Sequence, residues 1–309
     1  MLVSIQPDIV TNNIINFTAN EQNTNKHCEL GCNTNDISVV EMQLNTLKMA
    51  IMITKITFQL RYSTQFGQSL YIIGNHDILG NNNFDKAIPL QYLDANTWFV
   101  DLSIKTIESL NATIIYNYLL KNADGSFVED WGTDKTFNPA TFITNNVVII
   151  DTWNHAGFFD NAFYTVPFQN VLLKANHTNI TLKHPKKVTH IFRVKAPLLV
   201  KGQTLCLLGD NAILGNWQYK KVIIMAKAED AIYYEVAMDI SKADNNIAYK
   251  YGVYSIEEQK CLYLENGSNR MLDIATLQNQ QTIINDGLSS SHQPRMVLIS
   301  CVDGVTTLK

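Results

Sequence analysis

Side chains that could bind a metal ion stand together near the N-terminus of the chain. His27 directly precedes Cys28, and Cys32 follows Cys28 after three intervening residues. Two cysteines at this spacing resemble one half of a zinc site, which needs a second pair of ligands at similar spacing. The sequence contains no such second pair. We therefore predict no bound metal and no other cofactor.

Carboxylates are the second group that could carry chemistry. Acid and nucleophilic catalysis by carboxyl groups requires a pair that flanks a cleft. Glu129, Asp130, Glu265 and Asp273 lie in or beside loops, and they form no recognisable pair. We expect no catalytic residue and no enzymatic activity in this chain.

The most informative pattern is a duplication. Two segments have similar sequences, namely SLYIIGNHDILGN at 69–81 and TLCLLGDNAILGNW at 204–217. The same offset of 135 residues relates Gly74 to Gly209 and Gly80 to Gly215. The order is kept further along, where Tyr-Asn-Tyr at 116–118 corresponds to Tyr-Lys-Tyr at 249–251. Similarity over this length and offset indicates a duplicated domain instead of a short repeat unit.

Composition bounds the class of protein and its partners. A chain of 309 residues has room for two modest cores, and its net charge of -4 gives no basic surface for nucleic acid. Cys206 and Cys261 sit in apolar runs, which is typical of buried thiols and not of disulfides. No apolar run reaches the roughly 18 residues of a membrane span. Residues 1–13 lack the pattern of a leader peptide, so we expect a cytoplasmic protein without membrane contact.

Short strands separated by turns fill both copies. Residues 53–62 alternate apolar and polar side chains, as a half-buried strand does. Further strands are expected at 69–73, 97–102, 113–120 and 126–129 in the first copy, and at 190–194, 204–208, 232–238 and 247–254 in the second. This pattern predicts an all-β fold of two tandem immunoglobulin-like antiparallel β-sandwich modules.

The chain divides into five parts on this basis. Residues 1–51 are rich in Asn, Thr and Gln and are predicted to be a disordered or irregular tail. The first module spans 52–150, a connector 151–185, the second module 186–288 and a C-terminal tail 289–309. The connector carries aromatic side chains that should bury surface on a module and restrict the angle between the two: Trp153, Phe158, Phe159, Phe163, Tyr164 and Phe168.

The Leu-Gly-Asn-Trp turn, the Tyr-Lys-Tyr strand and the Glu-x-Gly-x-Asn-Arg close, in that order, resemble the starch-binding domain of carbohydrate-binding module family 20. Tandem copies with such a connector resemble the N-terminal, non-catalytic part of disproportionating 4-alpha-glucanotransferases, the amylomaltases of glycoside hydrolase family 77. The resemblance covers about residues 52–288. Residues 289–309 are too few to build a catalytic barrel of about 250 residues.

The resemblance implies a binding site in the second copy. Trp217 stands where the family has its first stacking tryptophan, and Lys250 matches its hydroxyl-binding lysine. Glu265 and Asn269 match polar residues of the closing loop. The second stacking tryptophan is missing, and Tyr263 could replace it if the loop rotates. The alternatives are that Trp217 caps the sandwich core and that Lys250 is an ordinary solvated lysine.

The first copy departs further from the family pattern at this site. Asn82 and Asn117 replace the tryptophan and the lysine, while Trp131 in the closing loop could either stack on a sugar or be buried. A second family site places aromatic residues at Phe66 and Tyr92. Both could equally be isolated rim hydrophobes.

Together these features predict non-catalytic binding of an α-1,4-glucan, as starch, glycogen or malto-oligosaccharide. The full-length parent would then be a 4-alpha-glucanotransferase. The alternative is a protein-interaction β-sandwich without affinity for sugar.

Overall fold

The structure is a computed structural model that describes residues 55–289, apart from the gaps given at the end of this paragraph, together with 300–302 and 305–307. The predicted N-terminal tail lies outside the described residues, as do His27, Cys28 and Cys32. The gaps are 104–112, 133–134, 140–141, 143, 166, 169–179, 183–184, 229, 231, 244–245 and 274–279.

The first module is a two-layer β-sandwich, as expected from the alternation of its residues. In β1, the apolar side chains Ile56, Phe58 and Leu60 are fully buried, and the polar residues between them face outward. One layer holds β1 (Lys55–Arg61), β4 (Gln91–Asp94), β5 (Thr97–Ser103) and β9 (Asn146–Thr152); the other holds β2 (Ser69–Gly74), β3 (Ile88–Pro89), β6 (Ile114–Lys121), β7 (Phe127–Glu129) and β8 (Thr136–Phe137).

The second module repeats this arrangement, so the predicted fold class is confirmed. One layer holds β10 (His190–Lys195), β13 (Ala226–Lys227), β14 (Tyr234–Met238) and β18 (Gln281–Leu288); the other holds β11 (Gln203–Gly209), β12 (Ile223–Ile224), β15 (Ile247–Ser255), β16 (Lys260–Leu264) and β17 (Arg270–Leu272). Short 3-10 helices lie between strands at η1 (Asp77–Leu79), η2 (Phe84–Lys86), η5 (Phe159–Tyr164) and η7 (Tyr219–Lys221). Near the C-terminus, β19 (Ser300–Val302) pairs with β20 (Val305–Thr307).

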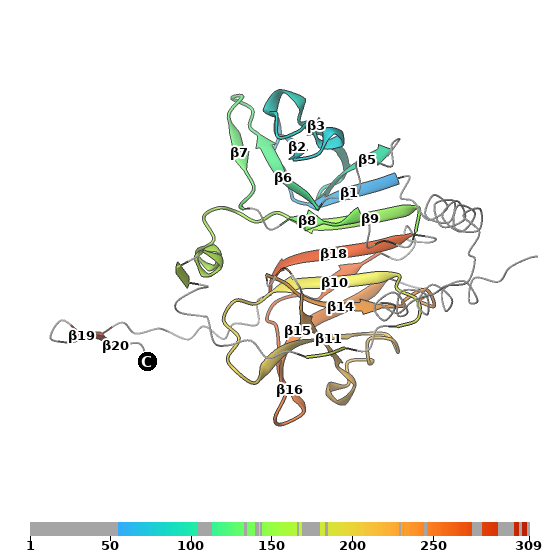
Figure 1. Cartoon of the computed structure of the whole chain (residues 1–309), viewed down its shortest axis with the longest axis vertical. Coiled ribbons are helices and arrows are strands. Elements are labelled where there is room, and N and C mark those ends of the chain that lie inside the picture. Colours follow the sequence, from blue (N-terminus) through green and yellow to red (C-terminus); the bar gives the residue numbers. More distant parts are fainter. Residues whose placement is uncertain are drawn as a thin grey trace, which may run out of the picture. The chain divides into compact units, whose positions relative to one another are not determined.

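The two modules are joined through a shared sheet, which the sequence did not predict. Strand β9 of the first module pairs in parallel with β18 of the second, so that Val147 lies opposite Gln281 and Asp151 opposite Asn285. The result is one eight-stranded sheet, in which β1, β9, β18, β10 and β14 follow one another (Figure 1). The pairing within each module is antiparallel except at β1–β9 and β10–β18, where the first and last strands of the module run side by side in the same direction.

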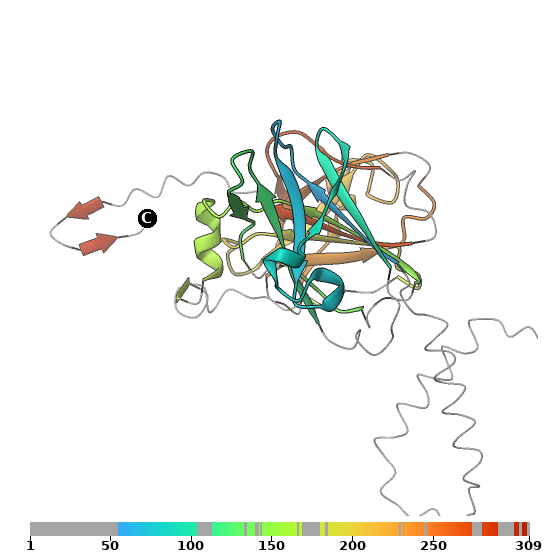
Figure 2. The ribbon, with the colours of Figure 1, turned by 90° about the horizontal axis from the view of Figure 1, so that it is seen from above.

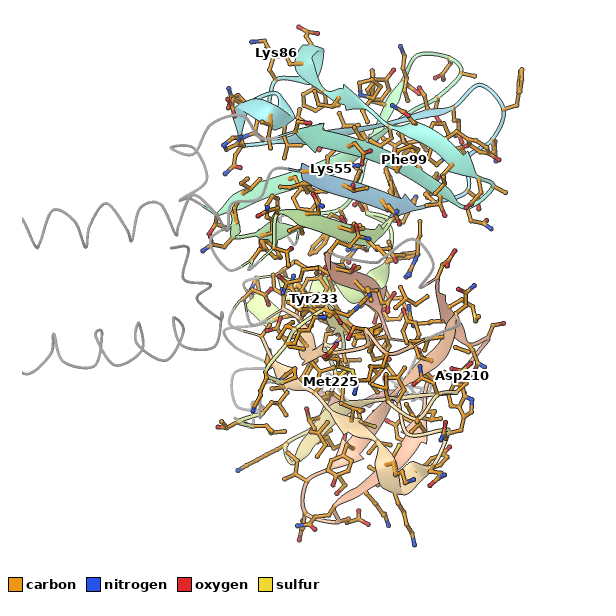
Figure 3. All side chains as sticks on the ribbon, turned by 90° about the vertical axis from the view of Figure 1, so that its right-hand side faces the viewer. Lys55, Lys86, Phe99, Asp210, Met225 and Tyr233 are labelled. Carbon is orange, nitrogen blue, oxygen red and sulfur yellow. The ribbon has the colours of Figure 1, made fainter. Side chains whose placement is uncertain are left out.

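Residues of β9 serve both hydrophobic cores. Val147 and Ile149 belong to the core of the first module, whereas Val148 and Ile150 belong to that of the second. Successive side chains of a strand point to opposite faces, so one strand can fill two cores. In Figure 3, Phe99 lies on the sheet of the first module and Met225 inside the second.

Buried aspartates explain the Tyr-x-Tyr repeat. The hydroxyls of Tyr116 and Tyr118 donate to Asp151 Oδ2 at 2.9 and 2.7 Å, and Asn285 Nδ2 donates to Asp151 Oδ1 at 2.8 Å. Burial raises the pKa of the Asp151 carboxyl. The second module repeats the motif, with the hydroxyls of Tyr249 and Tyr251 both 2.7 Å from Asp286 Oδ2.

The connector contacts the first module through its backbone. Asn154 N donates to Asp130 Oδ1 at 2.6 Å, and Trp131 N donates to Asn154 O at 2.8 Å. Helix η5 follows and stands at one side of the strands (Figure 2). Trp153 is buried as expected. Phe158 and Phe159 are not, since they are 49% and 73% exposed, and this corrects the expectation that every connector aromatic is covered.

Candidate functional site

The turn after β11 holds Trp217 in an uncommon backbone conformation. Gly215, Asn216 and Trp217 all have positive φ, at 84°, 50° and 55°. For a bulky residue this region costs about 1 kcal/mol or more and persists only where surrounding contacts enforce it. Here Trp217 N donates to Gly209 O at 2.7 Å, and a Cβ on Gly215 would meet Lys221 O at 2.6 Å. The turn is therefore rigid, and it leaves the Trp217 side chain half-buried at the rim of the module.

The first module has the same turn without the aromatic side chain. Asn82 also has a positive φ, of 56°, and its N donates to Gly74 O at 2.7 Å. Asparagine adopts this conformation more readily than most residues. The backbone motif is thus common to both copies, and only the second copy carries a stacking face.

A second aromatic lies close to Trp217 along the chain. Tyr219 begins η7 and is 52% exposed, and η7 lies beside β16, the strand of Tyr263. Tyr263 is half-buried and packs against the core of its module. Sequence reasoning missed Tyr219, although an aromatic two positions after Trp217 in a turn was a visible signal.

Lys250 holds the closing loop of the second module. Its Nζ donates to Gly267 O at 2.6 Å and to Glu265 O at 3.2 Å. An ammonium group has three donors, so these two bonds leave one hydrogen for a ligand. In the first module, Asn117 Nδ2 donates to Asp130 O at 2.9 Å, so the asparagine performs the same loop contact without the charge.

The carboxylate of Glu265 is buried and pairs with Arg270 instead of facing solvent. The residue is only 3% exposed, and Arg270 binds its carboxylate through Nε and Nη2 at 2.8 and 2.9 Å. Tyr251 N donates to the same carboxylate at 3.1 Å. This burial leaves the Glu265 carboxylate little access to a ligand, whereas Asn269 in the same loop is exposed, and sugar binding by either residue stays a prediction.

Trp131 is part of the contact between modules. The ammonium group of Lys195, on β10, lies 5.7 Å from the centroid of Trp131 and 5.5 and 5.3 Å from those of Tyr164 and Tyr233. Lys195 is 1% exposed, so these rings surround a buried cation. Trp131 is half-buried at this contact, and stacking of its ring on a sugar stays a prediction. Tyr233 is labelled in Figure 3.

Phe66 and Tyr92 lie on the surface of the first module. Phe66 is fully exposed in the connection between β1 and β2, and Tyr92 is exposed on the edge strand β4. The Tyr92 ring meets Trp98 edge to face at 5.5 Å. Ser63 Oγ donates to Asn96 Oδ1 at 2.6 Å and ties the β1–β2 connection to the β4–β5 turn, so both aromatics belong to the same end of the module.

No group of three or more metal-ligating side chains occurs in the described part of the chain. Nor does that part contain a helix long and apolar enough to cross a membrane.

Comparison with known families decides the assignment. The model described as "Starch binding domain" matches residues 53–147 and again 187–284, together more than half of the chain. The chain belongs to the starch-binding domain family. Both matches coincide with the two β-sandwich modules, and each ends on the module's last strand.

Two curated proteins are similar in sequence to this chain. The protein named 4-alpha-glucanotransferase DPE2, from Oryza sativa subsp. japonica, is 28% identical over 267 residues, which cover 82% of this chain and 26% of that protein. Cyclomaltodextrin glucanotransferase from Bacillus sp. (strain 1-1) is 33% identical over 91 residues, or 28% of this chain and 12% of that protein. The chain thus spans about a quarter or less of the length of these relatives.

Among solved structures, a glycoside hydrolase family 15 glucoamylase from Hypocrea jecorina is 29% identical in sequence, with a TM-score of 0.29. The match covers 33% of this chain and 17% of the glucoamylase chain. That score is too low to support an argument about geometry, so the sequence matches carry the assignment.

The two starch-binding copies have diverged in their surfaces. The second keeps the aromatic turn and the cationic side chain at the closing loop, in Trp217, Tyr219 and Lys250. The first lacks both at the equivalent positions but exposes Phe66 and Tyr92 elsewhere. A division of binding surfaces between the copies is consistent with this difference.

Proposed function

We propose that this chain binds α-1,4-glucan chains of starch, glycogen or malto-oligosaccharides without acting on them. The observation that supports the proposal is the turn of the second starch-binding copy, which holds the half-buried Trp217 two residues before the exposed Tyr219. A glucose ring offers an apolar C–H face that such rings can cover. Removal of about 100 Å² of apolar surface would contribute about 2 kcal/mol per ring before ordering costs.

Lys250 supplies the polar part of this site. Its remaining hydrogen can bond to a sugar hydroxyl, and the two loop carbonyls keep the ammonium group in place. A charge-assisted bond of this kind contributes about 1.5–3 kcal/mol. A single site of this composition should bind with a dissociation constant of about 10 μM to 1 mM.

We further propose that the chain corresponds to the region that precedes the catalytic part in 4-alpha-glucanotransferases of the amylomaltase type. The match to the rice protein over most of this chain supports this. The chain itself should neither hydrolyse nor transfer glucosyl units. Release of glucose from maltose by the purified chain would contradict that part.

Isothermal titration of the purified chain with maltoheptaose and β-cyclodextrin tests glucan binding. Electrophoresis through a gel with and without amylopectin provides a second measurement. We expect measurable heat of binding, with a dissociation constant in the micromolar to millimolar range, and retardation of the chain by amylopectin. Absence of both would reject the proposed function.

A further inference from the structure

A groove at the junction of the first module and the connector belongs to none of the surfaces described above. It has a volume of about 470 Å³ and is open to solvent. Its lining comes from the end of β1, the β4–β5 turn and the start of the connector: Tyr62, Ser63, Asn96, Trp153, His155 and Phe158, with Arg61 at one side.

Aromatic rings form most of this lining. The rings of Tyr62 and Trp153 are 4.9 Å apart at an angle of 41°, and Phe158 lies 5.8 Å from the His155 ring. Phe158 is 49% exposed. An exposed ring beside a buried one gives the groove an apolar face that another molecule can cover.

Neutral hydrogen-bonding groups accompany these rings. Gly157 N donates to His155 Nδ1 at 2.9 Å, so Nδ1 is an acceptor and Nε2 carries a hydrogen that it can donate. Ser63 Oγ donates to the Asn96 carbonyl oxygen, which leaves the Asn96 amide hydrogens and the Ser63 oxygen able to bond a ligand.

The groove has little net charge. Arg61 is its one charged lining residue, and the Arg61 guanidinium is paired with the buried carboxylate of Asp286. Such a groove suits an uncharged ligand that has an apolar face and several hydroxyls. It offers no complement to a phosphate, a carboxylate or an ammonium group.

We propose that this groove binds a further stretch of an α-glucan chain, an inference that rests on the proposed function. Tyr62 and Ser63 lie in the connection that also presents Phe66, and the bond from Ser63 to Asn96 joins this connection to the turn that follows Tyr92. A glucan that contacts Phe66 or Tyr92 can therefore continue into the groove. The first module then binds through a surface that includes the connector.

Amide chemical shifts of the full chain, labelled with ¹⁵N and titrated with maltoheptaose, test the groove. We expect the amides of Ser63, Asn96 and Gly157 to shift in a saturable manner. The substitution Phe158→Ala should weaken that response at least fivefold and leave the response near Trp217 unchanged. The matched control is Phe159→Ala, which removes a neighbouring ring that is 73% exposed and outside the groove, and which should change either response less than twofold.

Two failures can be told apart. If amides near Trp217 respond but those of the groove do not, or if Phe158→Ala behaves as Phe159→Ala, the groove assignment is wrong and glucan binding stands. If no amide responds, the proposed function itself fails. A concentration-dependent dimer that Phe158→Ala abolishes, measured by sedimentation, would instead assign the groove to a second copy of this chain.

Discussion

At the scale of single residues, the two copies separate two tasks that tryptophan can perform. Trp217 sits at a rim, on a backbone that is held rigidly in the left-handed region. Trp131 instead forms part of the ring of aromatics around the buried ammonium group of Lys195. Both indoles are half-buried, and of the two only Trp131 lies against that buried cation.

The substitution Trp217→Ala should raise the dissociation constant for maltoheptaose at least tenfold, which is about 1.4 kcal/mol. The circular dichroism spectrum should stay the same, because the turn is held by backbone bonds and by Gly215. The matched control is Asn82→Ala, at the same turn of the first copy, which should leave affinity within twofold. Equal losses in both variants would show that the turn, and not the indole, matters.

The substitution Glu265→Gln should lower the free energy of unfolding by about 3 kcal/mol. Loss of the buried carboxylate leaves Arg270 with only the more distant carboxylate of Asp286, 3.8 Å from its Nη1, and this second partner and the partial exposure of Arg270 keep the effect at the lower end for such pairs. Urea unfolding measures the change. Asn269→Ala, in the exposed part of the same loop, should cost less than about 0.5 kcal/mol. Full stability with lost glucan affinity would instead make Glu265 a ligand contact.

At the scale of elements, β10 carries a histidine whose protonation opposes folding. Burial lowers the pKa of His190 from its usual 6.5 to about 4, against a smaller opposite effect of Asp239. Between these two values the unfolded chain binds a proton that the folded chain does not. The stability from the neutral imidazole is therefore complete above about pH 6.5 and is lost as the pH falls toward 4.

The substitution His190→Gln should remove this dependence. The difference in unfolding free energy between wild type and variant should shrink by roughly 3 kcal/mol from pH 7 to pH 4. Urea unfolding at several pH values in that window provides the comparison. Stability curves that stay parallel would mean that another group causes the acid sensitivity.

The strands differ in how far the sequence could predict them. Alternation in 53–62 correctly indicated β1, and the strands expected at 126–129 and 190–194 correspond to β7 and β10. The pairing of β9 with β18 could not be predicted, because the register between strands from different copies depends on tertiary packing and not on local pattern. In retrospect, Val147 to Ile150 is a continuous apolar run, which is typical of a strand buried on both faces.

For the candidate site, the sequence indicated the elements but not the side-chain contacts. Trp217 was expected in a turn, Lys250 in a strand and Asn269 in a loop, and the structure has them there, while their role in sugar binding stays a prediction. The burial of Glu265 could not be predicted, because the partner that covers its carboxylate is brought in by β17. Trp131 was ambiguous because Lys195 reaches it from the other copy, a contact that comparison of the repeats cannot reveal.

At the scale of the whole described sandwich pair, the fused sheet predicts cooperative unfolding. Val148 and Ile150 leave the second core if the first module unfolds, since β9 carries them. We expect one calorimetric transition with matching calorimetric and van't Hoff enthalpies. Two resolved transitions would mean that the modules unfold independently and that the β9–β18 pairing adds little stability.

A fixed geometry also affects polymer binding. When a glucan is bound at one surface, the second surface of the same chain is present at a high effective concentration. This can raise the apparent affinity by about 10² where one glucan reaches both surfaces. Long glucans should therefore bind more tightly than maltoheptaose. The gain in affinity should exceed the statistical gain from the larger number of glucose units in each chain.

The parallel pairing of β9 and β18 also determines how a fragment that contains only the second module should behave. A fragment that begins after the connector would have β18 as an open edge, with the backbone groups that now bond to β9 unpaired. Two such fragments could use that edge as a template for each other and form dimers or aggregates that the intact chain does not. Affinities measured on a dissected half would then describe an artificial assembly.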